Sequence, residues 1–397
     1  MLRRKLKNGM TLLVDSRKTD SVAIGVHVGV GSNNENKEQA GLSHMLEHML
    51  FEGTKEKTAR ELSNAIESVG GECNAHTTQE RTYYYVVVPK KYVDRAIAML
   101  FDIMVNAAFD STSLRKEKNV VINEIRVVDD DPKSYQWIVL FKKLFQKHPA
   151  KNPVYGNVSA IVKSSRKNMV SYFKKYYVPN NIIISVSGGA GNAGHMIEKA
   201  FASLKQRKIQ QVKEVKEKPL QKVVAVKVKR KVEHSYLVIG FRAPPRTHKD
   251  SYTFDVIRAI LSRGQSSRLF DEIRNKRGIA YTVGADYEGG KTFGIFVAFV
   301  STRKKHVDEA RKILLTQVHL PNLSAQEVAD AKRYLEGNFM LINEDNKERA
   351  EQNALWEFLG KKRDAYVKNI RKVTRADVMR VIKKYVRQKY VEVLIQK

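Results

Sequence analysis

The residues best suited to chemistry lie in one short stretch, Gly41-Leu-Ser-His44-Met-Leu-Glu47-His48-Met-Leu-Phe51. On a helix, His44 and His48 project from the same face, close enough to bind one small metal ion. Glu47 flanks that face, where it can hold and deprotonate a metal-bound water. The leucine and methionine side chains around these three residues exclude water, and a dry environment strengthens electrostatic interactions.

A third metal ligand must come from elsewhere in the chain, because catalytic zinc sites usually have three protein ligands and one open position. The best candidate is Glu124, on a helix predicted at 113–128. Glu117 lies two turns earlier on nearly the same face, and we expect it to orient a ligand histidine. The apolar residues expected to face the core from this helix are Val120, Val121, Ile125 and Val128.

Histidines spaced four residues apart beside a glutamate also occur by chance in ordinary surface helices. Here His44, Glu47 and His48 lie in an apolar helix, where polar side chains without partners are costly. The apolar setting therefore favours a metal site over a surface helix.

Two similar patterns close the two halves of the chain. A helix predicted from an N-cap at Ser165 precedes a predicted strand at 182–186, and a helix predicted from an N-cap at Thr374 precedes a strand at 390–395. The two caps are 209 residues apart (374 − 165). This spacing predicts one duplicated unit, although any two helix–strand endings can look alike.

Helices and strands cluster along the chain instead of alternating strictly, which favours an α+β fold with mostly antiparallel sheets. The elements expected in the first half are strands at 10–14, 22–30 and 82–88 and helices at 40–52, 57–69 and 91–106. We predict a metal-binding domain at 1–205, a polar linker at 206–222 and a homologous domain at 223–397.

His44-Met-Leu-Glu47-His48 matches the H-x-x-E-H signature of inverted zinc peptidases. The chain resembles the pitrilysin-like (M16) metallopeptidases, in the half-length form similar to the mitochondrial processing peptidase β subunit and its bacterial relatives. Glu124 follows His48 at the spacing of that family's third ligand, and Glu117 matches its supporting glutamate. The resemblance implies two homologous domains of the LuxS/MPP-like metallohydrolase fold, with one Zn²⁺ per chain.

The resemblance also implies that residues 70–77 form an edge strand that pairs with an extended substrate backbone, with Asn74, Ala75 and His76 in contact. The Gly-Gly start and the β-favouring residues after it fit an exposed edge. An ordinary hairpin arm is the alternative. His76 stands where relatives commonly have an aromatic residue, so it is either a polar substrate contact or a filler.

In the second half, Arg274 and Tyr281 resemble a family pair that reaches across from the second domain. A guanidinium and a phenol are suitable donors to the oxyanion formed when a peptide carbonyl is attacked. The alternative is that both are structural surface residues. Because the zinc motif and this pair occur in one chain, we expect a self-sufficient monomer or homodimer.

The formal net charge of +30 raises the alternative of a nucleic-acid-binding protein. Charge alone gives weak, salt-sensitive binding, so we expect no specific nucleic acid partner. Residues 189–194 match G-x-G-x-x-G formally, but a dinucleotide site also needs a parallel β-α-β unit and a later acidic residue. We interpret them as a flexible turn.

The single cysteine, Cys73, excludes an internal disulfide and fits a reducing compartment. No apolar stretch reaches the ~18 residues of a membrane-spanning helix. The sequence therefore predicts a cytoplasmic zinc metalloendopeptidase that hydrolyses unfolded peptides or presequence-like segments. A non-catalytic scaffold of the same fold is the alternative.

Overall fold

The computed structural model describes residues 1–209, 215 and 217–397. The chain forms two compact units, each assembled from three segments. The first unit comprises Met1–Arg126, Asn152–Lys213 and Ile342–Arg363, and the second comprises Val127–Lys151, Glu214–Leu341 and Asp364–Lys397. Part of the predicted linker (210–214 and 216) lies outside the described residues, and the domain boundaries given above stay a prediction.

The first unit is built on a six-stranded sheet in the order β1-β2-β6-β3-β5-β4. All neighbouring strands are antiparallel except β2 and β6, which are parallel. Strand β4 forms one edge of this sheet. The strands are β1 (Leu2–Lys5), β2 (Thr11–Ser16), β3 (Ser21–Val28), β4 (Glu72–Thr77), β5 (Thr82–Pro89) and β6 (Ile182–Gly188).

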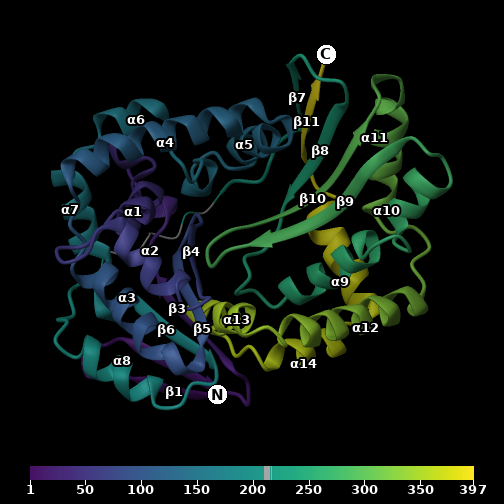
Figure 1. Ribbon diagram of the computed structural model, residues 1–397. Helices are drawn as coiled ribbons and strands as arrows, with labels where there is room; N and C mark the ends of the chain where they lie inside the picture. The colour runs from purple at the N-terminus through teal and green to yellow at the C-terminus, as the bar shows by residue number, and fades with distance from the viewer. Residues whose placement is uncertain (210–214, 216) are drawn as a thin grey trace. The chain divides into compact units, whose positions relative to one another are not determined.

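The helices of the first unit pack around this sheet (Figure 1). They are α1 (Leu42–Phe51), α2 (Ala59–Glu67), α3 (Val93–Val105), α4 (Ser111–Asp130), α6 (Val158–Lys163), α7 (Arg166–Tyr176), α8 (Ala193–Phe201) and α13 (Asn346–Phe358), with α4 running on into the second unit. Short 3₁₀ turns are η1 (Ser32–Asn34), η2 (Lys37–Gln39), η3 (Lys90–Tyr92) and η5 (Pro179–Asn181).

The second unit contains a five-stranded sheet in the order β7-β11-β8-β10-β9. Its strands are β7 (Val224–Lys229), β8 (Ser235–Arg242), β9 (Ala280–Gly289), β10 (Gly294–Thr302) and β11 (Val391–Gln396). Apart from β1, this sheet repeats the first one, including a single parallel pair, here β7 with β11. The same strand order in both sheets confirms the predicted α+β fold with two homologous units.

The helices of the second unit are α5 (Pro132–Leu144), α9 (Ser251–Ser262), α10 (Arg268–Phe270), α11 (Val307–Gln317), α12 (Ala325–Ile342), α14 (Ala365–Lys372) and α15 (Arg375–Val381). Two π-helices, η6 (Asp271–Asn275) and η8 (Ile382–Val386), continue α10 and α15, and 3₁₀ turns lie at η4 (Pro149–Lys151) and η7 (Lys304–His306).

One helix from each half of the sequence completes the unit built mainly from the other half. Helix α5 packs on β8 and β11 of the second sheet, and α13 packs on β3 and β6 of the first. Gly240 of β8 lies directly under Leu140 of α5, where a Cβ atom would come within 2.7 Å of the leucine side chain. The two units have thus exchanged equivalent helices.

The repeated helix ends have the predicted caps. Ser165 accepts a hydrogen bond from the amide of Asn168 at the start of α7. Thr374 forms a capping box with Asp377 at the start of α15. Both caps satisfy amide groups that a helix leaves unpaired at its first turn, so these two boundaries are confirmed.

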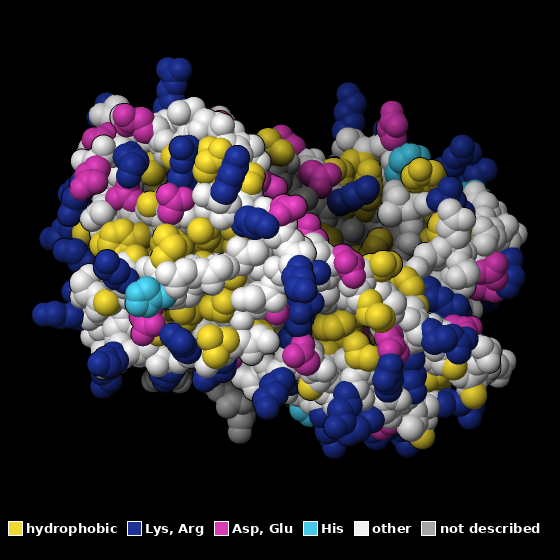
Figure 2. Space-filling view, turned by 60° about the horizontal axis from the view of Figure 1, so that its bottom comes forward, with side chains coloured by type: hydrophobic (Ala, Val, Ile, Leu, Met, Phe, Trp, Pro, Cys, Tyr) yellow, Lys and Arg dark blue, Asp and Glu magenta, His cyan; other side chains and the backbone are white. Residues whose placement is uncertain are grey.

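The positive charge is dispersed over the face that Figure 2 shows. Figure 2 shows Lys and Arg side chains spread over the face in view and interspersed with acidic and apolar ones. Such dispersion is typical of solvated helix faces rather than of a single binding stripe. Within the described ranges, no helix is both long and apolar enough to cross a membrane.

Candidate metal centre

Helix α1 holds the central residues of the site, and its start is set by a glycine and a glutamate. Gly41 has a φ of +91°, and a Cβ atom there would lie 2.6 Å from the carbonyl oxygen of Tyr155. The Glu35 carboxylate accepts hydrogen bonds of 2.7 Å from the amides of Gly41 and Ser43. Burial raises the pKa of Glu35 to about 7, although these hydrogen bonds favour its ionised form.

The apolar side of α1 fixes the direction of its polar side. Its core-facing side chains are fully or almost fully buried: Leu42, Met45, Leu46, Met49 and Leu50. Because residues on a helix face recur at three or four positions, burying these side chains directs His44 and His48 to a common face. Their rings lie 4.7 Å apart, centroid to centroid.

Helix α4 brings its two glutamates to either side of the His48 ring. Glu117 Oε2 lies 3.0 Å from His48 Nδ1, and Glu124 Oε2 lies 3.6 Å from His48 Nε2. The same Glu124 oxygen lies 3.7 Å from His44 Nε2. Because Glu117 and Glu124 are seven residues apart on α4, one carboxylate lies at the Nδ1 side of the His48 ring and the other at its Nε2 side.

The predicted core face of α4 is partly wrong. Val121 and Ile125 are buried, but Val120 is 36% exposed. At about 100° per residue, Val120 lies roughly 100° from the centre of the buried stripe formed by Leu114, Glu117, Val121 and Ile125. The buried stripe of α4 is therefore narrower than the set of four apolar residues that was predicted to face the core.

His44, His48 and Glu124 form a group that fits a divalent zinc ion. One ligand atom from each lies within 4.8 Å of the others. Ligand atoms of a tetrahedral zinc site lie roughly 3.3 Å apart, so the distances of 3.6 and 3.7 Å need only small side-chain adjustments. Burial, and then the charge of His48, lowers the pKa of His44 to about 4, which keeps it in the neutral form that binds metals.

Glu47 lies beside this group and contacts the edge strand. The hydroxyl of Thr77, the last residue of β4, donates a hydrogen bond of 2.5 Å to Glu47 Oε2. Burial raises the pKa of Glu47, while the Thr77 hydrogen bond and the charges of His48 and His76 oppose that rise. The sequence analysis did not single out Thr77, although Thr77 is the last residue of the segment 70–77 that the resemblance indicated.

Strand β4 carries the predicted substrate residues at the edge of the first sheet. Asn74 is exposed, and Ala75 and His76 are half-buried. Each pairs with a tyrosine of β5 on one side only, which leaves the other side of the strand open. The edge position of residues 72–77 is confirmed, whereas substrate contact stays a prediction.

His76 is held by a carboxylate from α13. Its Nε2 lies 3.2 Å from Glu351 Oε1, and Arg81 donates a 2.8 Å hydrogen bond to the same oxygen. Burial alone would raise the pKa of Glu351, but His76 and Arg81 outweigh burial and lower it to about 2. No signal near His76 in the sequence points to Glu351, because only the fold brings them together.

Arg274 and Tyr281 meet each other within the second unit. The Arg274 guanidinium carbon lies 4.6 Å from the centre of the Tyr281 ring, and its Nη1 donates to the Tyr281 carbonyl at 3.3 Å. Gly278, with a φ of +62°, turns the chain between them. Tyr281 is 80% exposed, so its hydroxyl is available to a ligand. A catalytic role for either residue stays a prediction.

The glycine-rich loop at 189–194 connects β6 to α8. Among the described residues, the next strand after α8 is β7, which belongs to the other sheet. The parallel β-α-β unit of a dinucleotide site is therefore missing from this part of the chain. This agrees with the interpretation of the loop as a turn.

Comparisons with known proteins agree with this arrangement of fold and site. Residues 10–158 match the family profile described as insulinase (peptidase family M16), and residues 163–335 match the peptidase M16 inactive domain. The chain is 30% identical to an uncharacterized zinc protease of Bacillus subtilis, over 89% of this chain and 87% of that protein. It is 31% identical to an uncharacterized zinc protease of Rickettsia felis, over 86% and 83%.

The fold also matches solved structures. A protease from Helicobacter pylori has a TM-score of 0.93 at 22% identity and covers 100% of this chain and 99% of its own. A structure from Pseudomonas fluorescens, described as a peptidase M16 inactive domain, has a TM-score of 0.91 at 17% identity, with coverage of 100% and 97%. With these folds and the two family profiles, the chain belongs to peptidase family M16.

Proposed function

We propose that this protein is a zinc-dependent endopeptidase that hydrolyses unfolded peptides or presequence-like segments. The observation that carries the proposal is the convergence of His44, His48 and Glu124 beside the buried carboxylate of Glu47. The names of the Bacillus and Rickettsia relatives, both zinc proteases, support it.

In this proposal His44, His48 and Glu124 hold one zinc ion per chain. When bound, zinc polarises the scissile carbonyl and lowers the pKa of a water molecule at its open position. Glu117 accepts a hydrogen bond from His48 Nδ1, which fixes the imidazole orientation and leaves Nε2 free for the metal.

Glu47 acts as general base and then as general acid. It takes a proton from the attacking water and later gives it to the amine that leaves. The Thr77 hydroxyl holds one carboxylate oxygen in place, which leaves the other oxygen for the water. The buried position of Glu47 favours both proton transfers, because burial raises its pKa and so makes the carboxylate a stronger base.

Strand β4 aligns the substrate. An extended peptide adds to the open edge as a further strand, with its backbone bonded to the region of Asn74 and Ala75 and its side chains near His76. Arg274 and Tyr281 donate hydrogen bonds to the oxyanion that forms at the attacked carbonyl. We further propose that the enzyme is cytoplasmic and acts as a monomer or homodimer, which analytical ultracentrifugation distinguishes.

The test combines metal content with peptide cleavage. Wild-type protein should contain about one zinc per chain, and it should cleave fluorogenic peptides until a chelator is added. Glu47→Gln should retain zinc but lose cleavage. Full activity of the zinc-loaded variant would exclude this mechanism, and a wild-type protein with neither zinc nor cleavage would be a scaffold built on a peptidase fold.

A further inference from the structure

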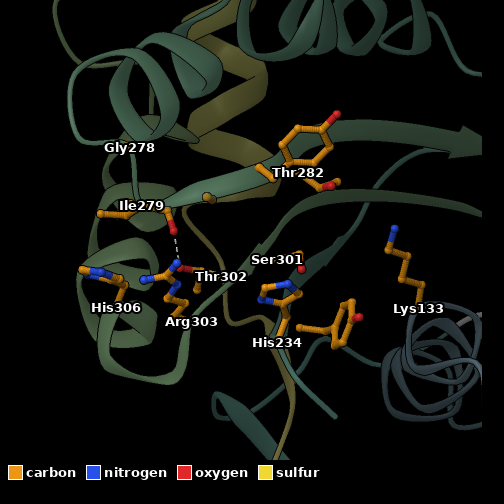
Figure 3. Close-up of a pocket in the computed structure, with 12 residues that line it drawn as sticks. Lys133, His234, Gly278, Ile279, Thr282, Ser301, Thr302, Arg303 and His306 are labelled. Atoms are coloured by element: carbon orange, nitrogen blue, oxygen red, sulfur yellow. Dashed lines mark hydrogen bonds between the residues drawn. The ribbon is translucent and has the colours of Figure 1, made fainter.

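A cavity of about 510 Å³ lies in the second unit at the start of β9, outside the metal centre. Its walls come from α5, from the start of β8, from the start of β9, from the end of β10 and from the η7 turn that follows β10 (Figure 3). This volume is in the range of ordinary ligand sites. Tyr281 forms part of the wall.

A β-bulge shapes this cavity. Along the β9–β10 ladder, Ser301 pairs with Thr282, but the next residue, Thr302, pairs with Ala280. Tyr281 is therefore the extra residue of the bulge, and its side chain is turned out to solvent. The buried Thr302 hydroxyl donates a hydrogen bond of 2.5 Å to the carbonyl of Ile279, which fixes the turn before the bulge.

The charged and titratable lining of the cavity is basic. It includes Lys133, His234, Arg303 and His306, and none of its twelve residues is acidic. Figure 3 shows Lys133, His234 and Arg303 around the same space, although they come from separate parts of the unit. Glu309 lies 3.7 Å from His306 but does not line the cavity.

Arg303 is the most specific of these groups. Its guanidinium makes no hydrogen bond or ion pair with any other residue in the described part of the chain. A guanidinium presents a planar fork of donors that matches a carboxylate or phosphate. Half-buried Ser301 and Thr282 add hydroxyl groups to the same lining. These features fit an anionic group with several acceptor oxygens.

We infer that this cavity binds a carboxylate of the peptide substrate, either an acidic side chain or the terminal carboxyl group. The inference rests on the proposed function, which places Tyr281 against the substrate, and it adds the class of substrate. A basic lining disfavours presequence-like segments, which are rich in arginine and poor in acidic residues. Acidic unfolded peptides are then the preferred substrates.

Pairs of fluorogenic peptides that differ only by Glu or Gln at one position test this inference. For at least one substituted position, the Glu peptide should be cleaved with a kcat/KM about tenfold higher than that of its Gln partner. This ratio is expected for a charge-assisted hydrogen bond. Arg303→Ala should bring that ratio close to one by lowering kcat/KM for the Glu peptide. The matched control is Lys304→Ala, which removes the same charge one residue further on, at an exposed position outside the lining.

Equal cleavage of Glu and Gln peptides at every position would overturn the inference. A Lys304→Ala effect as large as that of Arg303→Ala would do the same, because it would show general attraction to a basic surface. A carboxyl-terminal site is tested in the same way with free and amidated peptide ends.

A binding measurement separates failure of this inference from failure of the proposed peptidase activity. Fluorescence anisotropy with the Glu47→Gln protein needs no cleavage, and the Glu peptide should bind about tenfold more tightly than the Gln peptide. Inorganic phosphate serves as the competitor. If phosphate binds in an Arg303-dependent way while the two peptides bind equally, the cavity takes a free anion and the substrate inference is wrong.

Discussion

Glu351 Oε1 lies 3.2 Å from Nε2 of His76, although one residue belongs to α13 and the other to β4. The same oxygen accepts a hydrogen bond from Arg81, on the loop that follows β4. Helix α13 thus supports the edge strand that we propose aligns the substrate. Glu351 touches no reacting atom in this scheme, so it is a positioning residue.

The first prediction concerns the pH dependence of stability. The pKa of Glu351 is about 2 in the folded protein, against an ordinary value of 4.5. Because the folded pKa is the lower one, the stabilisation is present above pH 4.5 and is lost as the pH falls from 4.5 to 2. Its size is on the order of 3 kcal/mol. Denaturant unfolding of Glu351→Gln at neutral pH should reveal a loss of that order and a weaker acid dependence.

The control for this variant is Glu344→Gln, which removes an equivalent charge from an exposed position just before α13. It should leave the unfolding free energy nearly unchanged. An acid dependence of Glu351→Gln identical to that of the wild type would contradict the role assigned to this carboxylate. The KM of the Glu351→Gln variant for peptides should rise more than its kcat falls, because the strand that aligns the substrate loses its support.

A second prediction concerns Glu117. Replacing it with alanine removes the acceptor 3.0 Å from His48 Nδ1 and frees the ring to rotate. Loss of such a supporting carboxylate typically weakens metal affinity about 10- to 100-fold. Competition with a zinc chelator of known affinity measures this change. Glu56→Ala, at an exposed position of the same unit, is the control, and equal affinities for both variants would refute the supporting role.

Thr77 provides a third prediction. Thr77→Val keeps the shape of the side chain but removes the hydroxyl that donates to Glu47. We expect kcat to fall by about tenfold or more, with zinc content and KM nearly unchanged, because a charge-assisted hydrogen bond contributes about 1.5–3 kcal/mol. Thr77→Ser restores the hydroxyl and should restore most of the activity. If both variants are equally active, the hydrogen bond does not serve catalysis.

The fourth prediction tests the start of α1. Gly41→Ala meets both an unfavourable φ of +91° and a contact of 2.6 Å with the carbonyl of Tyr155. It should destabilise the protein by more than about 1 kcal/mol and lower its zinc content. Gly191→Ala is the comparison, since Gly191 also has a positive φ but no atom near its missing Cβ. It should be the milder of the two in thermal unfolding.

The helices of the metal centre could be predicted because the residue spacing that identifies each of them lies within a single short segment. The spacing of His44 and His48, and of Glu117 and Glu124, defines a face once the helix is known. The predicted strand at 22–30 ends earlier, at Val28, where two glycines, Gly29 and Gly31, follow within three residues. Such terminal differences are ordinary for strands bounded by glycine.

The contacts that sequence reasoning missed depend on tertiary structure. Thr77 reaches Glu47 only because β4 lies beside α1, and Glu351 reaches His76 only because α13 packs on the first sheet. Neither pairing leaves a periodic signal along the chain. The exchange of α5 and α13 could not be predicted from the polar linker at 206–222 either, because both helices lie far from that linker in the sequence.

The exchanged helices bear on how the protein is made. Domains generally fold as they emerge from the ribosome, with the N-terminal one first. Here the unit that contains His44, Glu47 and His48 needs Ile342–Arg363 to complete it, a segment translated long after these three residues. A nascent chain stalled before residue 351 therefore carries the whole zinc motif but lacks Glu351 behind the edge strand. The fold thus delays completion of the first unit until the segment Ile342–Arg363 has been translated, well after the metal-binding motif.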